Sequence, residues 1–344
     1  MSEHKNNDDM KKMDEKAAPT RARERDAFWF VEDLTPDFQL RMSLKRIMYD
    51  GRSKFQRLQV VETGEFGKTL LMDGCTQSSQ NDEHIYHETL VHPSMLMHPN
   101  PKKVFIGGGG EFATAREVLR HKSVERCVMI DLDKDACDIC RKELPEWNDG
   151  AYEDKRLHVE YVDAKKWLED TKEKFDVIIM DICDPIEAGP GYLLYTKEFY
   201  TFLRTRLNEG GVIVTQSGPG AHFNVKKECF TVIHSTLRSV FGSVAPYTVD
   251  IPSFGCDWGF NMVLDTCTQD ATKQGTMDSV LTHLLDIPMS KIDTLIEKRI
   301  NGKLKFLDGF SWRGLFGTAK EIRTLCKEET RVMTKDEPVF MYTA

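Results

Sequence analysis

The amino-acid sequence predicts an α/β fold: a Rossmann-like parallel sheet of the methyltransferase type, preceded by a small N-terminal antiparallel β domain. Through the second half of the chain, short apolar runs alternate with segments of helical periodicity, as expected of a parallel sheet covered by helices. The first of these runs, residues 104–106, leads into four consecutive glycines, Gly107 to Gly110, and then into a segment with apolar residues at helical spacing. Strand, tight turn and helix in this order open a nucleotide-binding βαβ unit.

Three regions are expected along the chain. Residues 1–24 consist almost entirely of charged and polar side chains, so they cannot bury enough apolar surface to fold, and we expect a disordered tail. Residues 25–98 should form the N-terminal β domain with a linking helix, and residues 99–344 the Rossmann-like catalytic domain. A chain of 344 residues that is 40% hydrophobic is long enough to bury a large core.

The N-terminal domain is predicted from three short β-like runs, residues 55–61, 68–72 and 75–79. The hairpin dipeptide Asp73-Gly74 joins the last two runs. A helix is expected to begin at the cap Asn81-Asp82 and to end near residue 97. It would connect the antiparallel domain to the glycine-rich turn.

Four predicted strands each end in a carboxylate. Glu111 follows the glycines, and Asp131, Asp163 and Asp181 end the apolar runs that begin near residues 127, 157 and 177. The carboxyl ends of parallel strands meet at one edge of the sheet, where ligands bind. Aspartate is common in loops after strands, so one such residue would mean little. Four of them together predict a shared site.

Composition limits the classes of partner and cofactor. Acidic residues (55) outnumber basic ones (47), which gives a formal net charge of -8 and argues against a nucleic-acid partner. No apolar run approaches the ~20 residues of a membrane helix. Nine scattered cysteines without an export signal predict reduced thiols and a cytoplasmic protein. His84 and His87 beside Glu88 do not match a zinc motif, so no metal is expected.

Glu111 helps to decide which nucleotide the glycine turn holds. Gly108, Gly110 and Ala113 satisfy the degenerate dinucleotide pattern, and Asp131 lies 20 residues after Glu111, where an acid accepts the ribose hydroxyls. The carboxylate of Glu111 would repel a pyrophosphate, at a cost of several kcal/mol in a partly dry turn. A sulfonium nucleoside fits better, and decarboxylated S-adenosylmethionine, which ends in an ammonium, fits best.

Such a donor transfers an aminopropyl group to an amine nitrogen. The amine is protonated near neutral pH and cannot attack until a base removes that proton. We expect Asp181 to be the proton acceptor and Asp184 to hold a second ammonium of a polyamine substrate.

The chain resembles the polyamine aminopropyltransferases, the spermidine and spermine synthase family, over nearly its whole folded length. The resemblance is carried by Phe55-Gln56, residues 71–74, Tyr86, Gly107 to Glu111, Asp163 and the signature of residues 175–185, FDVIIMDICDP. The family implies a homodimer or homotetramer without metal or cofactor, which releases methylthioadenosine. Position by position, it implies that the donor is held by Gln56, His87, Glu111, Asp131, Asp163 and Ala164, that the amine is held by Tyr86 and Asp184, and that Asp181 accepts the proton.

Within the family, several details are similar to the plant thermospermine synthases. Examples are Glu111 in place of Asp, His87 in place of Gln, and residues 251–260, IPSFGCDWGF. Spermidine synthases carry a Pro-Thr-Tyr-Pro run in the last stretch, so we expect Phe254 and Trp258 to line a pocket for a longer amine. The expected acceptor is spermidine, aminopropylated at N1 to give thermospermine.

Four alternatives stay open at this point. Spermine synthase would modify the other end of spermidine, and spermidine synthase would use putrescine. The fold alone also allows an S-adenosylmethionine methyltransferase, which the carboxylate of Glu111 disfavours. A non-catalytic polyamine-binding protein would not need both Asp181 and Asp184.

Overall fold

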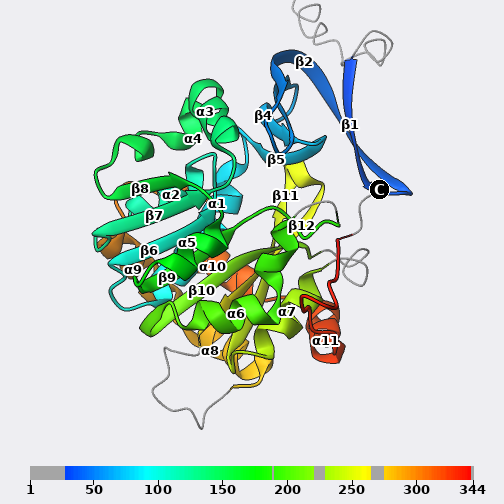
Figure 1. Ribbon diagram of the computed structural model, residues 1–344. Helices are drawn as coiled ribbons and strands as arrows, with labels where there is room; N and C mark the ends of the chain where they lie inside the picture. Colours follow the sequence, from blue (N-terminus) through cyan, green and yellow to red (C-terminus); the bar gives the residue numbers. More distant parts are fainter. Residues whose placement is uncertain (1–27, 188–189, 221–228, 265–274, 342–344) are drawn as a thin grey trace, which may run out of the picture.

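A computed structural model describes residues 28–187, 190–220, 229–264 and 275–341. The tail expected for residues 1–24 lies outside these ranges. Two sheets are present, one of five strands and one of seven, with helices around the larger one (Figure 1). The α/β class with a small N-terminal antiparallel sheet is confirmed.

The N-terminal sheet is a meander in which each strand pairs with the next in antiparallel orientation. Its strands are β1 (Phe28–Thr35), β2 (Phe38–Arg52), β3 (Arg57–Thr63), β4 (Gly67–Met72) and β5 (Cys75–Ser79). The predicted runs correspond to β3, β4 and β5, and Asp73 (φ 49) and Gly74 (φ 88) have the positive φ angles that a two-residue hairpin turn needs. The hairpin β1–β2 was not predicted, although residues 38–44 of β2 alternate apolar and polar side chains; neither strand has a well-buried face.

The second sheet has the strand order β11-β12-β10-β9-β6-β7-β8. Strands β6 (Lys103–Gly108), β7 (Arg126–Asp131), β8 (Leu157–Tyr161), β9 (Phe175–Asp181) and β10 (Leu207–Pro219) are parallel. Strands β11 (Val244–Ile251) and β12 (Cys256–Val263) make antiparallel pairs. The wholly parallel sheet expected from the sequence is therefore mixed at one edge, because only the short η4 (Pro252–Phe254) joins β11 to β12 and no crossover helix intervenes.

Helices cover both faces of this sheet. Val104 and Ile106 of β6 belong to one hydrophobic cluster, and Phe105 between them belongs to another. Both faces of a parallel strand are thus buried, which explains its continuous apolar run. The helices are α1 (Glu83–Met97), α2 (Ala113–Leu119), α3 (Lys134–Glu143), α4 (Pro145–Asn148), α5 (Ala164–Asp170), α6 (Lys197–Arg204), α7 (Phe230–Arg238), α8 (Met277–Asp286), α9 (Met289–Arg299), α10 (Gly309–Phe316) and α11 (Lys320–Glu328), with the short turns η2 (Ala151–Glu153) and η3 (Pro190–Tyr195).

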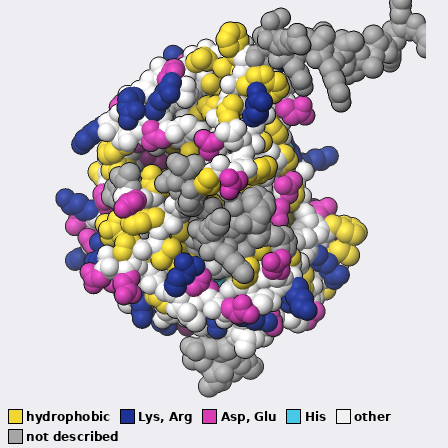
Figure 2. All heavy atoms as spheres, turned by 90° about the vertical axis from the view of Figure 1, so that its right-hand side faces the viewer, with side chains coloured by type: hydrophobic (Ala, Val, Ile, Leu, Met, Phe, Trp, Pro, Cys, Tyr) yellow, Lys and Arg dark blue, Asp and Glu magenta, His cyan; other side chains and the backbone are white. Residues whose placement is uncertain are grey.

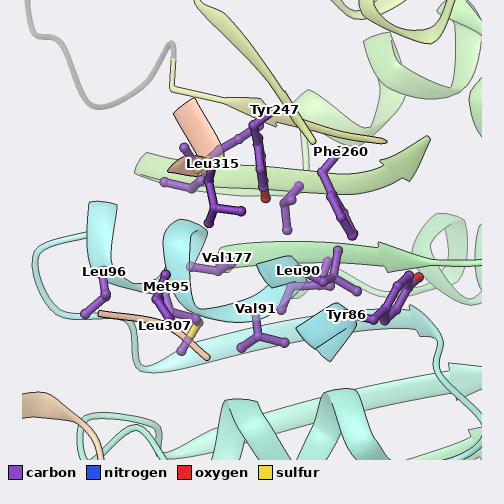
Figure 3. Packing of buried hydrophobic residues seen from close by; sticks show 14 of the residues in the cluster. Tyr86, Leu90, Val91, Met95, Leu96, Val177, Tyr247, Phe260, Leu307 and Leu315 are labelled. Atoms are coloured by element: carbon purple, nitrogen blue, oxygen red, sulfur yellow. The ribbon is translucent and has the colours of Figure 1, made fainter. Parts of the chain in front are cut away.

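Helix α1 lies at the centre of the molecule, between the N-terminal sheet and the seven-stranded sheet (Figure 1). Twelve of its fifteen residues are buried. Figure 3 shows Leu90 and Val91 packed among side chains from distant segments, including Tyr247, Phe260 and Leu315. A helix enclosed on this scale is held rigidly, so the polar side chains at its N-terminal end have fixed positions.

Asp82 is the N-cap of α1 by position, as the sequence predicted, but its side chain does not cap the helix. Its carboxylate instead accepts hydrogen bonds from the backbone N–H (2.7 Å) and hydroxyl (2.9 Å) of Ser253. Asp82 thereby ties the start of α1 to η4, the segment expected to shape the acceptor pocket.

Charges are mixed over the surface. Figure 2 shows basic and acidic side chains interspersed on one face, without a broad field of either sign. Among the described residues, no helix is both long and apolar enough to cross a membrane. Over the same residues, no group of three or more His, Cys, Asp or Glu side chains is arranged to hold a metal ion.

Candidate active site

The glycine turn brings strands β6 and β9 into unusually close contact. Gly108 has φ +83, and a Cβ atom at this position would lie 2.1 Å from the backbone oxygen of Asp181. The next residue, Gly109, donates its N–H to that same oxygen at 3.1 Å. Only glycine combines this φ with so close an approach. The turn therefore fixes where Asp181 emerges from β9.

The Asp181 carboxylate is fixed by two hydroxyl donors from neighbouring helices. Tyr86 of α1 donates to Oδ1 at 2.6 Å, and Thr114 of α2 donates to Oδ2. Burial raises the pKa of Asp181, while the charge of His87 and the two hydroxyl hydrogen bonds lower it. The result is an oriented carboxylate with a raised pKa, which suits a group that accepts a proton.

Glu111 does not stand alone at the turn. Its Oε1 lies 2.6 Å from Nε2 of His87, and its Oε2 accepts the Ser78 hydroxyl at 2.7 Å. Burial alone would lower the pKa of His87, but the carboxylates of Glu111 and Glu83 outweigh burial and raise it to about 10. His87 is thus an imidazolium at neutral pH, buried behind Glu111.

Asp131 ends β7 next to the glycine turn. Its Oδ1 accepts the backbone N–H of Asp133 at 2.8 Å, and its burial raises its pKa to about 6. A Cβ at Gly110 would lie 2.9 Å from Asp131 Oδ2, so the turn and this carboxylate are in contact. Gln56 donates from Nε2 to Asp133 Oδ2 at 3.0 Å, so a residue of the N-terminal domain also lies near Asp131.

Asp163 and Ala164 lie at the same edge of the sheet but further out. They follow β8, which is separated from β6 by β7. Asp163 is exposed and its carboxylate caps α5 by accepting the backbone N–H of Lys166 at 2.8 Å, whereas Ala164 is buried. The structure therefore groups Glu111, Asp131 and Asp181 closely and leaves Asp163 at the periphery.

The residues predicted to bind the acceptor amine are connected through Gln216, to which the sequence reasoning assigned no role in the site. Gln216 Nε2 donates to Asp184 Oδ1 at 3.0 Å, and its Oε1 accepts the Trp258 indole N–H at 3.1 Å. Phe254 packs edge-on against both Trp258 (centroids 4.7 Å apart) and Tyr86 (6.1 Å). Burial raises the pKa of Asp184 to about 6.

Thr114, Ser78 and Gln216 are the polar partners that sequence reasoning missed. Each is a small or neutral side chain inside an otherwise ordinary helix or strand, so its type alone carries no signal. Gln216 gave the only hint, as a buried amide near the end of the apolar strand β10. Such a residue requires hydrogen-bond partners.

The comparisons with known proteins assign this arrangement to a family. The Spermine/spermidine synthase domain matches residues 83–274, more than half of the chain. The chain belongs to the spermidine and spermine synthase family. The Spermidine synthase tetramerisation domain matches residues 28–80, which include the N-terminal sheet.

Two curated relatives cover most of this aminopropyltransferase. The thermospermine synthase ACAULIS5 of Arabidopsis thaliana is 39% identical over 320 residues, which are 93% of this chain and 89% of the relative. A polyamine aminopropyltransferase of Aeropyrum pernix is 39% identical over 315 residues, 91% of this chain and 95% of the relative. The enzyme is accordingly a polyamine aminopropyltransferase.

Solved structures agree with this assignment. A spermidine synthase in complex with the transition-state analogue AdoDATO has a TM-score of 0.75 and 28% identity, and the match covers 89% of this chain and 97% of that one. Spermidine synthase from Thermotoga maritima has a TM-score of 0.73 and 26% identity, and the match covers 89% of this chain and 96% of that one. The match therefore spans nearly all of each relative.

Proposed function

We propose that this enzyme transfers the aminopropyl group of decarboxylated S-adenosylmethionine to spermidine, giving thermospermine and methylthioadenosine. The observation that carries the chemistry is the Asp181 carboxylate, which is half-buried at the strand edge and oriented by Tyr86 and Thr114. The choice of acceptor is supported by the 39% identity to a plant thermospermine synthase.

The proposed reaction is a direct displacement. The acceptor nitrogen attacks the aminopropyl carbon bound to the sulfonium, the new C–N bond forms as the C–S bond breaks, and the sulfur leaves as a neutral thioether with the bonding electron pair. The attacking nitrogen must first be a free amine, so its proton passes to Asp181. A raised pKa makes that carboxylate a stronger base than an ordinary aspartate.

The donor is assigned to the edge formed by β6, β7 and β8. Asp131 is assigned to the ribose hydroxyls; Gln56 lies nearby, since it donates to Asp133, whose backbone N–H binds Asp131. Asp163 and Ala164 at the outer end of this edge are assigned to the adenine. Glu111 is assigned to the ammonium end of the donor, with His87 behind it.

The acceptor is assigned to the opposite side of Asp181. Tyr86 and Asp184 would bind its nitrogens, and Phe254 with Trp258 would contact its methylene chain. The β1–β2 hairpin closes this side, since a Cβ at Gly255 would lie 3.1 Å from Leu34 Cδ1. Apolar walls with acids at intervals suit a polyamine, whose charges are separated by methylenes.

The same hairpin supports a homo-oligomer. Several of the exposed large hydrophobic side chains in the described residues lie on β1 and β2, among them Phe28, Val31, Phe38 and Ile47. These strands fall within the match to the tetramerisation domain. An apolar surface of this kind is typical of a protein–protein contact, and we propose that copies of the chain associate through it.

The function is tested by product analysis. Purified enzyme is incubated with decarboxylated S-adenosylmethionine and either putrescine, spermidine or norspermidine, and the products are separated by a method that resolves thermospermine from spermine. Thermospermine from spermidine is expected. Spermine as the product, or putrescine as the most efficient acceptor, would refute the assigned acceptor. Tighter calorimetric binding of S-adenosylmethionine than of its decarboxylated form would instead favour a methyltransferase.

The role of Asp181 is tested by Asp181→Asn, which keeps the size of the side chain and removes its basicity. Turnover should fall at least about 100-fold, the usual contribution of a positioned base, while binding of methylthioadenosine changes little. An Asn variant with nearly unimpaired turnover would exclude Asp181 as the proton acceptor.

A further inference from the structure

A continuous row of ion pairs runs from Glu111 away from the strand edge. Beyond the Glu111–His87 pair, His87 Nδ1 lies 2.9 Å from Glu83 Oε2, and that same oxygen accepts from Arg116 Nη2 at 2.9 Å. Arg116 also contacts Glu117 Oε1 through Nε at 2.8 Å. The row alternates in sign: carboxylate, imidazolium, carboxylate, guanidinium, carboxylate.

These side chains are almost fully removed from solvent. The exposed fractions are 0% for His87, 8% for Glu83, 12% for Arg116 and 1% for Glu117. Removing such charges from water is costly unless each has a close partner, so the charge of each member depends on its neighbours. His87 and Arg116 lower the pKa of the buried Glu83 to about 2, against the opposing effect of burial.

The charged and titratable groups that face His87 come from every element packed around it. Glu83 and Tyr86 belong to α1, Glu111 to the turn before α2, and Asp181 to β9, while Arg116 of α2 acts through Glu83. Of these groups, Glu83 and Arg116 lie on the side away from the strand edge, so they have no direct access to a ligand bound at Asp181.

We propose that Glu83 and Arg116 are positioning residues that act through His87: they hold its ring between two carboxylates, and so orient Glu111 and tune the ionisation of Asp181. Arg116 fixes Glu83 with two guanidinium nitrogens, Nη1 to Oε1 at 3.2 Å and Nη2 to Oε2 at 2.9 Å. His87 Nδ1 in turn lies 2.9 Å from the Glu83 carboxylate and 2.7 Å from the Glu83 backbone oxygen, and of these two partners only the carboxylate carries a charge. Without Glu83, the buried ring would keep only one carboxylate.

The end of this row opposite Glu111 borders a cavity of about 800 Å³, lined by residues that include Glu83, Arg116 and Glu117. Water can therefore reach Glu83 and Arg116 from a direction other than the strand edge. A change at Glu83 can be hydrated from this cavity, which makes Glu83→Gln a mild perturbation of packing. Its main effect should be electrostatic.

The proposal deepens the proposed function, since it assumes that Asp181 is the base. The experiment compares the full-length wild-type enzyme with Glu83→Gln. Histidine ¹⁵N spectra, with the His87 signal identified by its loss in His87→Gln, report the protonation of the ring. The pH profile of kcat/KM reports the ionisation of the base. In Glu83→Gln, His87 should titrate at least about one pH unit lower but keep its proton throughout the acid limb. That limb should move downward by about half a unit, roughly a threefold gain in kcat/KM below the limb, because Asp181 loses a nearby negative charge while its positive neighbour persists.

Glu88→Gln is the matched control on the same helix. Glu88 is equally buried, but its carboxylate accepts the backbone N–H groups of Lys305, Phe306 and Leu307 and has no place in the ion-pair row. Its substitution should lower the melting temperature without moving the acid limb or the His87 titration. Arg116→Lys, which keeps the charge but loses the paired contact, should give a smaller shift than Glu83→Gln and replaces it if that variant does not fold.

An unchanged His87 titration or an unchanged acid limb in a folded Glu83→Gln or Arg116→Lys variant overturns the proposal. So does an equal shift in Glu88→Gln, because the effect would then follow from lost stability. The assignment of Asp181 fails separately, through an active Asp181→Asn variant. The ¹⁵N titration of His87 does not depend on that result.

Discussion

The hydroxyl of Tyr86 offers the sharpest test of how Asp181 is prepared for proton transfer. Tyr86→Phe removes one oxygen, the donor at 2.6 Å from Asp181 Oδ1, and leaves the aromatic ring in place. That ring packs against Phe260 (5.5 Å between centroids) and Phe254 (6.1 Å), contacts that a phenylalanine retains. The substitution therefore changes the hydrogen bonding of the carboxylate and little else.

The size of the effect follows from the hydrogen bonds that remain. A hydrogen bond to a charged group contributes about 1.5–3 kcal/mol, or one to two pKa units. Thr114 still donates to Oδ2, and His87 still lowers the pKa of Asp181, so we expect the smaller value. The pKa of Asp181 should rise by about one unit, because its ionised form loses a donor while its burial persists.

The assay is the pH dependence of kcat/KM for the acceptor amine, with saturating donor. The acid limb of Tyr86→Phe should lie about one unit above that of the wild type, while the plateau at high pH falls less than about tenfold. Tyr247→Phe is the control, since Tyr247 is also buried and stacks on Phe260, but its hydroxyl bonds to the backbone oxygen of Thr89. Its acid limb should not move.

A uniform rise in KM for the amine at every pH, with the acid limb unchanged, would refute this reasoning. That outcome would show that Tyr86 only binds the amine and does not tune Asp181. A shift of the limb in Tyr247→Phe would refute it as well, because the effect would then follow from a general loosening of the core.

Three further predictions concern single side chains. Gln216→Ala should raise KM for the amine about tenfold and leave KM for the donor unchanged, because Asp184 loses its amide donor and a hydrogen bond to a charged group is worth about 1.5 kcal/mol or more. The pKa of His87 is raised from 6.5 to about 10, so its contribution to stability is complete below pH 6.5 and is lost as pH rises toward 10. Urea titrations should show a fall of about 1.4 kcal/mol per pH unit over this window that is absent in His87→Gln. Gly108→Ala should lower the free energy of unfolding by roughly 2–5 kcal/mol, because a Cβ would meet the backbone of Asp181 at a positive φ.

Each of these predictions has a contradicting outcome. An equal rise of both KM values in Gln216→Ala would indicate general distortion of the site. Parallel pH slopes for wild type and His87→Gln would mean that His87 is not protonated in the folded state. For Gly108→Ala, the control is Gly74→Ala. Gly74 also has a positive φ (+88), but no atom lies within 4 Å of a Cβ added there. If the two alanine variants are equally destabilised, close contact with Asp181 contributes nothing.

The sequence was informative wherever a local backbone conformation or a position at a strand end restricts the residue type. Consecutive glycines, acids at strand ends and the Asp73-Gly74 turn all appear where they were expected, because positive φ angles and strand-end ligand sites restrict the choice of residue. The family signature around Asp181 allowed the class of reaction to be predicted. These features are local in the chain, so they can be recognised without knowledge of the fold.

What the sequence could not predict depends on contacts between distant segments. Asp82 was expected to cap α1, yet its carboxylate binds Ser253, which is 171 residues away. Gln216 connects Asp184 to Trp258 only because β10 lies between β9 and β12. Strand β1 has no alternating hydrophobic pattern, whereas residues 38–44 of β2 do alternate apolar and polar side chains and could have been recognised as a strand.

The surroundings of Glu111 change how donor selection at the glycine turn should be understood. The sequence suggested a lone carboxylate that repels anions, but the structure places an imidazolium 2.6 Å from it, and this charge cancels much of its long-range field. The remaining influence of Glu111 on a ligand acts through direct contacts. One carboxylate oxygen is paired with the His87 imidazolium and the other accepts the Ser78 hydroxyl, and the remaining lone pairs of both oxygens can only accept hydrogen bonds. An ammonium offers three donors to such a group and a carboxylate offers none. The proposed preference for a decarboxylated donor would therefore rest on hydrogen-bond polarity, which salt screens far less than charge repulsion at a distance.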